Sequence, residues 1–278
     1  MLRWAKPQRR ALKAFLRDGS SEHWEVILGT RRKRNRDDAL LEEYRALLES
    51  RRKERDIFAD RVPLVSVRIA TYNRAKILVE RTIPSVLSQT YRNIEIVIVG
   101  DHCTDDTEER IRALGDPRIT FVNLPSRPDY PRYREYFWMT AGTVPMNRAL
   151  DLCRGSWIAP LDDDDQFTPD HVEVLLGAAL ERKWEFCYGV MEMEIRPGEF
   201  RRVGSYPLRG AHICHPAVLY STILDFLRYD RESWLLWEPA DWHMWRKVRD
   251  IGTRYGFIDR VVGVHHLEQT SIGRDGLE

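Results

Sequence analysis

The sequence lacks the cysteine pattern of a disulfide-stapled or zinc-binding protein. Its 278 residues include only four cysteines, and no two of them form a CxxC pair. Widely spaced cysteines fit free thiols in a reducing compartment better than a disulfide framework or a structural zinc site. The four are Cys103, Cys153, Cys187 and Cys214.

Long hydrophobic runs are also missing. No stretch approaches the roughly 18 uninterrupted apolar residues that a membrane-spanning helix needs. The charged N-terminus, MLRWAKPQRRALKAFLRDG, lacks the apolar centre of a signal peptide. We therefore expect a cytoplasmic protein, which could rest as a peripheral protein on the inner face of a membrane.

A large net charge is the third absence. The net charge of +1 creates no overall field that would favour nucleic acid, so we expect no nucleic-acid partner. Residues 1–60 nevertheless hold 16 Lys/Arg against 11 Asp/Glu. Within them the cluster Arg31–Arg34 fits a solvated loop or helix end, and contact with acidic lipid or a partner is the alternative. A dimerisation arm, and thus a homo-oligomer, is another use for this segment.

The hydrophobic pattern changes at Pro63. Before it, apolar residues at helical spacing predict a basic helical appendage over residues 1–60. After it, short apolar runs alternate with helical stretches, which predicts βαβ units and a parallel sheet. The expected strands are 65–70, 94–99, 119–124 and 157–161.

The second half has a different pattern. It predicts a hairpin around Arg196–Glu199, a Trp-rich helix over 239–251 and a late strand over 255–264. We expect residues 61–168 to bind a nucleotide and residues 169–278 to bind an acceptor.

Four aspartates, Asp162–Asp165, directly follow the apolar strand that ends at Leu161. Ligands of open α/β sheets usually bind at the carboxyl ends of strands. Carboxylates suit hard cations such as Mg²⁺ or Mn²⁺, which also bind phosphate oxygens. The alternative is an ordinary acidic turn in which Asp165 or Asp170 caps the helix near Pro169.

Three segments occur in an order that resembles family 2 glycosyltransferases. They are VSVRIATYN (65–73), EIVIVGDHCTDDT (95–107) and NRALDLCRGSWIAPLDDDDQF (147–167). The resemblance implies a GT-A fold, a nucleotide-binding α/β/α sandwich with a mixed, mostly parallel central sheet, here carrying the N-terminal helical appendage. The three motifs together are specific to the family, although not to its substrate.

The resemblance also implies donor-binding positions. Thr71, Tyr72 and Asn73 match the turn that contacts the nucleotide, and Asp101 matches the acidic residue that reads the uracil or ribose. Gly100 stands where the family commonly has a second acidic residue, so one donor contact departs from the pattern. The ends of the DXD motif fall on Asp162 and Asp164. Metal ligands are expected at Asp164, Asp165 and His266.

The resemblance also implies catalytic positions at the start of the predicted Trp-rich helix. In the segment Trp237–Trp242, Asp241 matches the base that removes a proton from the acceptor hydroxyl, and Glu238 is the alternative. An acid at this point could instead only complement the helix dipole. His215 matches a position that lines the acceptor site, and a structural role is equally open for it.

The connection Ser126–Val144 is longer and more aromatic than a minimal link. Its arginines, Arg127, Arg132 and Arg134, could bind diphosphate or an anionic acceptor, because guanidinium groups make bidentate contacts with phosphate. Loops of this length often serve as lids, so we predict a lid on the donor side.

Together these features predict a metal-dependent, inverting glycosyltransferase that moves a sugar from a UDP-sugar to a hydroxyl of a glycan or lipid-linked acceptor, in polysaccharide or glycoconjugate synthesis. One alternative is an inactive scaffold of the same fold that still binds nucleotide or glycan. A sugar-phosphate nucleotidyltransferase is disfavoured, because the turn Thr71–Arg74 has none of the glycines of a phosphate loop.

Overall fold

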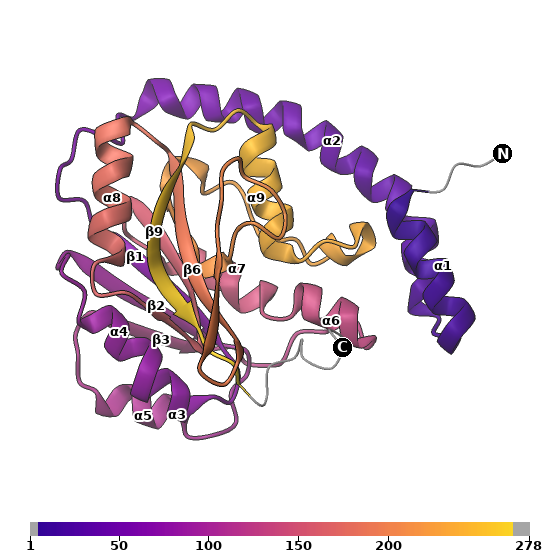
Figure 1. Ribbon diagram of the computed structural model, residues 1–278, viewed down its shortest axis with the longest axis horizontal. Helices are drawn as coiled ribbons and strands as arrows, with labels where there is room; N and C mark the ends of the chain where they lie inside the picture. Colours follow the sequence, from indigo (N-terminus) through magenta and orange to yellow (C-terminus); the bar gives the residue numbers. More distant parts are fainter. Residues whose placement is uncertain (1–4, 269–278) are drawn as a thin grey trace.

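Two helices form the N-terminal part of the computed structural model, which describes residues 5–268. α1 (Lys6–Asp18) ends at Gly19 in the left-handed conformation, and α2 (Glu22–Glu54), which is 33 residues long, runs back beside it and continues past it. The prediction that Arg31–Arg34 form a loop or helix end is wrong, because they lie inside α2. Figure 1 shows α2 along one side of the body, with α1 at its far end. No helix within residues 5–268 combines the length and apolar character needed to cross a membrane.

A nine-stranded mixed sheet forms the centre of the molecule, in the order β3-β2-β1-β4-β8-β6-β9-β5, with β7 paired to β6. β1, β2, β3 and β4 are mutually parallel neighbours. β1 and β2 are strands because their β-branched, apolar runs are buried along almost their whole length. The first four strands are β1 (Val65–Thr71), β2 (Ile94–Gly100), β3 (Ile119–Asn123) and β4 (Trp157–Asp162). A strand was predicted at each of these four places, and the structure confirms all four.

Short helices connect these strands. A π-helical segment, η1 (Leu78–Thr82), lies between α3 (Ala75–Ile77) and α4 (Ile83–Leu87). α5 (Thr107–Ala113) follows β2. α6 (Arg134–Thr140) and α7 (Thr143–Leu152) lie between β3 and β4, and α7 packs on β1 and β2.

The second half adds strands of both directions to the same sheet, because β6 and β9 pair in parallel while β5, β7 and β8 pair antiparallel with their neighbours. The predicted hairpin is β6 (Phe186–Arg196) with β7 (Glu199–Val203), and the late strand is β9 (Tyr255–His265). Two short strands, β5 (Asp165–Phe167) and β8 (Val218–Ser221), were not predicted. α8 (His171–Arg182) packs on β6, and α9 (Ala240–Asp250) confirms the Trp-rich helix. In Figure 1 α8 and α4 lie on one side of the strands, and α7 and α9 on the other.

α2 shares the core of the sheet. Leu48 of α2, and Ile57 just after the helix, belong to the same buried cluster as residues of β1, β4 and α9. Near its end, Arg52 donates two hydrogen bonds of 2.7 Å to the carboxylate of Glu185, which is fully buried. Arg254 donates to the same carboxylate. Because a buried carboxylate needs such partners, the C-terminal half of α2 is fixed to the sheet by charge as well as by packing.

The four cysteines are free thiols, and Cys103 and Cys187 are buried. The prediction of free cysteines is therefore confirmed.

Candidate functional site

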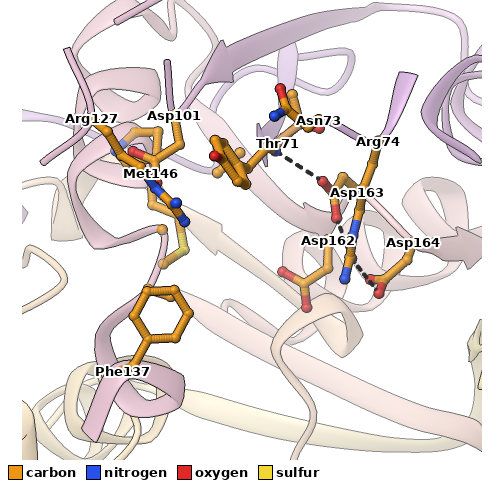
Figure 2. Close-up of a pocket in the computed structure, with 15 residues that line it drawn as sticks. Thr71, Asn73, Arg74, Asp101, Arg127, Phe137, Met146, Asp162, Asp163 and Asp164 are labelled. Carbon is orange, nitrogen blue, oxygen red and sulfur yellow. Dashed lines mark hydrogen bonds and ion pairs between the residues drawn. The ribbon is translucent and has the colours of Figure 1, made fainter. Parts of the chain in front are cut away.

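The carboxyl ends of three parallel strands meet at one edge of the sheet. The register sets Thr71 opposite Gly100 and Ala70 opposite Asp162. The turn after β1, Asp101 and the acidic run therefore come together, where a ligand of an open α/β sheet would lie. They open onto a cavity of about 540 Å³, whose remaining wall comes from α6, α7 and the connection before them (Figure 2).

One wall of the cavity combines a guanidinium group, an aromatic ring and a buried carboxylate. The Arg127 guanidinium lies 3.7 Å from the centroid of the Tyr72 ring, and its Nε lies 3.9 Å from Asp101 Oδ2. The Tyr130 hydroxyl donates to Asp101 Oδ1 at 3.1 Å. Burial raises the pKa of Asp101 above its usual value, while Tyr130 and Arg127 act in the opposite direction. The predicted residues Thr71, Tyr72, Asn73 and Asp101 all line this cavity.

Arg74 neutralises the middle of the acidic run. Its Nη1 lies 2.9 Å from Asp163 Oδ1 and 2.6 Å from Asp164 Oδ2 (Figure 2). Asp163 also accepts a 3.4 Å hydrogen bond from the backbone N–H of Tyr72. Thr82 fixes the turn from below, because its hydroxyl donates to the carbonyl of Asp163 at 2.8 Å. Two like charges can lie side by side here because the guanidinium lies between them.

Asp165 lies on β5 and is buried. Its Oδ1 is 2.6 Å from His265 Nδ1 at the end of β9, which pairs with β5. Burial lowers the pKa of His265, but the Asp165 carboxylate outweighs this effect and raises it to about 9. The neighbouring His266, predicted as a metal ligand, lies 3.2 Å from Gln166 Oε1 and 3.9 Å from Glu194 Oε2. Of the two histidines, His265 is thus the partner of the acidic run.

Asp162 faces a buried polar chain. His215 Nδ1 lies 2.7 Å from Asp162 Oδ1, and His215 Nε2 lies 3.0 Å from the Tyr229 hydroxyl. Arg68, fully buried in the middle of β1, donates to both His215 and Tyr229. His215, predicted at the acceptor side, therefore connects the acidic run to the interior of the sheet.

The structure separates the two predicted catalytic acids. Asp241 lies in the first turn of α9, and burial raises its pKa, with His215 opposing the rise and Asp162 adding to it. Asp241 does not line the cavity that the acidic run opens onto. Glu238 instead makes a two-oxygen ion pair with Arg246, at 3.0 to 3.1 Å, and lines a separate cavity beside α2.

Arg134 begins α6 and is exposed. It does not line the cavity, whereas Arg127 from the same connection does. Phe137, Ala141 and Gly142 of the connection also line the cavity. The predicted lid segment therefore forms one wall of the cavity, with Arg127 as its inward-facing arginine.

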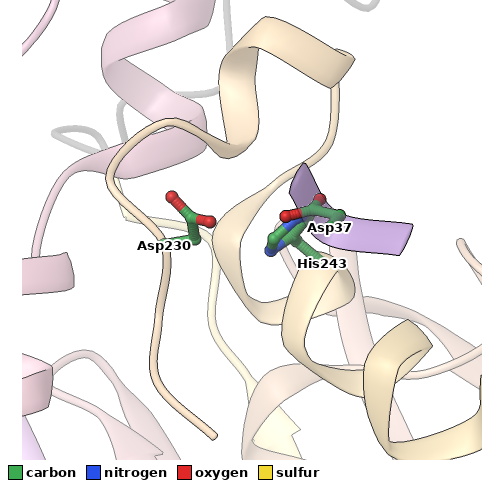
Figure 3. Close-up of side chains that lie close together, drawn as sticks. All are labelled: Asp37, Asp230 and His243. Atoms are coloured by element: carbon green, nitrogen blue, oxygen red, sulfur yellow. The ribbon is translucent and has the colours of Figure 1, made fainter. Parts of the chain in front are cut away.

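A second group of charged side chains lies between α2 and α9. Among residues 5–268, three potential metal ligands come close together only at Asp37, Asp230 and His243 (Figure 3). The Lys33 ammonium occupies this group, because its Nζ donates to Asp37, lies 2.7 Å from Asp230 Oδ2 and lies 3.5 Å from His243 Nε2. Lys247 Nζ lies 3.5 Å from Asp37 Oδ1. Two ammonium groups balance two carboxylates, so the group is complete without a metal ion.

Sequence reasoning missed Arg74 and Arg68. Arg74 directly follows the Thr71-Tyr72-Asn73 motif, but nothing in the local sequence indicates that its side chain turns toward the aspartates. Arg68 is the only charged residue in an otherwise apolar or small strand, which signals a buried partner for its charge.

The family model described as glycosyl transferase family 2 matches residues 66–131 and 144–236, more than half of the chain. The chain belongs to glycosyl transferase family 2. The resemblance of its three motifs is thereby confirmed, and so is the expected enzyme class, a glycosyltransferase.

The matches to curated relatives cover less than half of each relative. The chain is 27% identical over 236 residues to hyaluronan synthase of Pasteurella multocida, covering 80% of this chain and 22% of that protein. It is 30% identical over 232 residues to chondroitin synthase of Escherichia coli, covering 76% and 30%. A third relative, from Escherichia coli, is UDP-Glc:alpha-D-GlcNAc-diphosphoundecaprenol beta-1,3-glucosyltransferase WfaP, at 41% over 125 residues and 45% of each chain. The chain thus spans less than half the length of each.

Solved structures share the fold. Residues 1–349 of S. aureus TarS in complex with UDP-GlcNAc align with a TM-score of 0.59 at 16% identity, over 76% of this chain and 60% of that chain. The mannosyltransferase PcManGT from Pyrobaculum calidifontis, in complex with GDP-Man and Mn²⁺, aligns with a TM-score of 0.57 at 20% identity, over 77% and 60%. The predicted GT-A fold is confirmed by these alignments.

Proposed function

We propose that this family 2 glycosyltransferase moves a sugar from a UDP-sugar to a hydroxyl of a glycan or lipid-linked acceptor, with inversion at the anomeric carbon. The observation that supports this most directly is the single cavity that joins the predicted nucleotide turn to the acidic run. Asp241, in the first turn of α9, belongs to the acceptor half, and the charge of Asp162 in the acidic run contributes to its raised pKa.

The nucleotide would lie against Tyr72 and Arg127. A flat base can stack on the Tyr72 ring, and the guanidinium already above that ring is a suitable partner for a phosphate or for the base edge. Asp101 would accept a hydrogen bond from the uracil or the ribose, with Thr71 and Asn73 beside it. The named complex of TarS contains UDP-GlcNAc, and the WfaP relative carries UDP-Glc in its name, which favours UDP as the nucleotide.

The acidic run has the donor chemistry for Mn²⁺ or Mg²⁺. Asp164 and Asp165 offer carboxylate oxygens and His265 an imidazole beside them, with Asp162 close enough for the ribose or donor. Arg74 and His265 hold these carboxylates now, so the ion would take the place of Arg74 at Asp164. When bound, the metal would neutralise the leaving diphosphate. His266 stays a predicted ligand, and its present partners are Gln166 and Glu194.

Asp241 is our candidate for the general base. Inversion requires a carboxylate that removes the acceptor proton while the acceptor oxygen attacks the anomeric carbon. Burial raises the pKa of Asp241, and a higher pKa makes a carboxylate a stronger base. Glu238 is less suited, because Arg246 occupies both of its oxygens.

The test combines binding and turnover. UDP, GDP and dTDP-sugars are titrated with and without Mn²⁺, and hydrolysis and transfer to an acceptor library are measured. We expect UDP-sugars to bind best, Asp165→Asn to lose the effect of the metal, and Asp241→Asn to keep donor binding while transfer falls at least 100-fold. Asp259→Asn, at an exposed carboxylate on β9, is the matched control. If no nucleotide sugar binds, the proposed donor class is refuted. If Asp241→Asn transfers sugar at the full rate, Asp241 is not the general base.

Donor binding without turnover on any acceptor would favour the alternative that the chain is an inactive scaffold of the same fold. Position in the cell and oligomeric state also stay proposals. A cytoplasmic enzyme at the inner membrane face is the arrangement that a lipid-linked acceptor would require.

A further inference from the structure

The end of the α1–α2 hairpin exposes large apolar side chains. Leu16 and Leu28 are 75% and 76% exposed, the highest values among the large hydrophobic residues of the described chain, and Trp24 is 42% exposed. The Phe15 ring contacts the Trp24 ring, with centroids 5.0 Å apart, so the two helices contribute to one surface. We name Phe15, Leu16, Trp24 and Leu28 the hairpin apolar surface.

The exposure is not a by-product of poor packing. The inner faces of both helices are filled, because Ala11, Val26 and Ile27 are buried in a cluster with Tyr136 and Trp234. Apolar side chains on the opposite face have no core to enter. Exposed apolar residues gathered at one place commonly mark an interaction surface.

Basic residues continue the same helical faces. Arg9 and Lys13 precede Leu16 at helical spacing on α1, and Arg31 follows Leu28 three residues later on α2. These side chains are exposed, and none of them has an ion-pair partner within residues 5–268. Leucine and tryptophan beside unpaired cations are the composition of helices that lie in the headgroup region of an anionic bilayer.

The hairpin is bonded to the segment between β3 and α7, other residues of which line the donor cavity. The Glu22 carboxylate accepts a 2.7 Å hydrogen bond from the backbone N–H of Arg132 and a second from that of Tyr133. His23 Nδ1 lies 2.7 Å from the hydroxyl of Tyr136 on α6. A partner that binds the hairpin would therefore also orient the cavity relative to itself.

We propose that the hairpin apolar surface and the unpaired basic residues beside it dock this enzyme on an anionic lipid bilayer. The apolar side chains enter the headgroup region, and Arg9, Lys13 and Arg31 bind lipid phosphates. The docking does not depend on the proposed transfer reaction, because vesicle binding requires neither donor nor acceptor.

The experiment is co-sedimentation of the full chain with vesicles of phosphatidylcholine alone and of phosphatidylcholine with 30% phosphatidylglycerol. We expect binding only to the anionic vesicles, weakening as salt is added. Trp24→Ala/Leu28→Ala should lower the partition coefficient at least fivefold, and Lys13→Gln/Arg31→Gln should lower it more than tenfold.

Two control variants match the substitutions in chemistry. Phe200→Ala removes an exposed aromatic ring on β7, and Lys53→Gln removes an exposed charge at the other end of α2. Both should bind vesicles like the unaltered protein. All variants are checked by far-UV circular dichroism and thermal unfolding, which show whether the fold is retained without relying on nucleotide binding.

Equal binding to both vesicle types, or equal losses for surface and control variants, would overturn the proposal. A dimer in sedimentation velocity that dissociates in Trp24→Ala/Leu28→Ala, without vesicle binding by the unaltered protein, would assign the surface to a second copy and also overturn it.

Discussion

Replacing Lys33 by methionine tests how the N-terminal helices are held to the glycosyltransferase domain. The Lys33 side chain is 1% exposed, and its ammonium contacts Asp37 on the same helix and Asp230 on the domain. Methionine has a similar shape but no charge. Lys247 would then be the one ammonium group beside the carboxylates of Asp37 and Asp230, with Arg246 3.7 Å from Asp37, while burial lowers the pKa of His243.

Breaking a buried ion pair by removing one partner costs about 3–5 kcal/mol, since a buried charge is left uncompensated. Unfolding entropy is about 2.1 cal/mol/K per residue, so for 278 residues the midpoint of thermal unfolding should fall by about 5–9 °C. Differential scanning calorimetry in the presence of a chelator measures this midpoint without a contribution from bound metal.

Two variants accompany Lys33→Met. Lys53→Met changes an exposed lysine of the same helix and should move the midpoint by no more than about 1 °C. Lys33→Met/Asp230→Asn removes the unbalanced negative charge and should recover at least half of the loss. A midpoint for Lys33→Met within about 2 °C of the unaltered protein would refute the argument that the ammonium holds the two carboxylates together.

Two further predictions concern the cavity wall and the response to acid. Glu22→Ala removes two hydrogen bonds to the backbone of the segment that supplies one cavity wall, so the Kd for UDP, measured by calorimetry, should rise about 5–30-fold. Glu25→Ala, in the same helical turn, should leave this Kd unchanged. Equal Kd values for the two variants would contradict the coupling between hairpin and cavity. Burial lowers the pKa of His171 to about 4, so the unfolded chain takes up the proton first and stability is lost as pH falls from about 6.5 toward 4. Between pH 7 and pH 5 the free energy of unfolding in urea should drop about 2 kcal/mol more for the unaltered protein than for His171→Gln, and equal drops would show that His171 is not responsible.

The sequence predicted the elements whose side chains repeat a simple pattern. β1 and β2 consist mainly of β-branched and other apolar residues, and such runs identify strands that are covered on both faces. The short strands β5 and β8 carry too few residues for a pattern, and their place depends on pairing with β9 and with β4 and β6. Local sequence does not encode such pairing.

The site divides in the same way. Thr71, Asp101 and the acidic run could be placed together because each follows a parallel strand, and strand ends meet at one edge. The role of Arg74 could not be foreseen, because it depends on how the turn after β1 approaches β4. The choice between His265 and His266 depended on the register between β5 and β9. Lys33 seemed solvated within a run of basic residues, and only the approach of α9 buries it.

The charged contacts of α2 also limit how this helix can be exchanged between related enzymes. The Lys33 ammonium contacts the carboxylate of Asp230, and the Arg52 guanidinium contacts that of Glu185. Both carboxylates come from parts of the chain that are distant in sequence. A chimera with a foreign N-terminal segment would have to bring a cation to both places, 19 positions apart along the helix. A donor helix with apolar residues there would leave carboxylates stranded inside the recipient. Compatibility of such hybrids can therefore be judged from two positions before any are made.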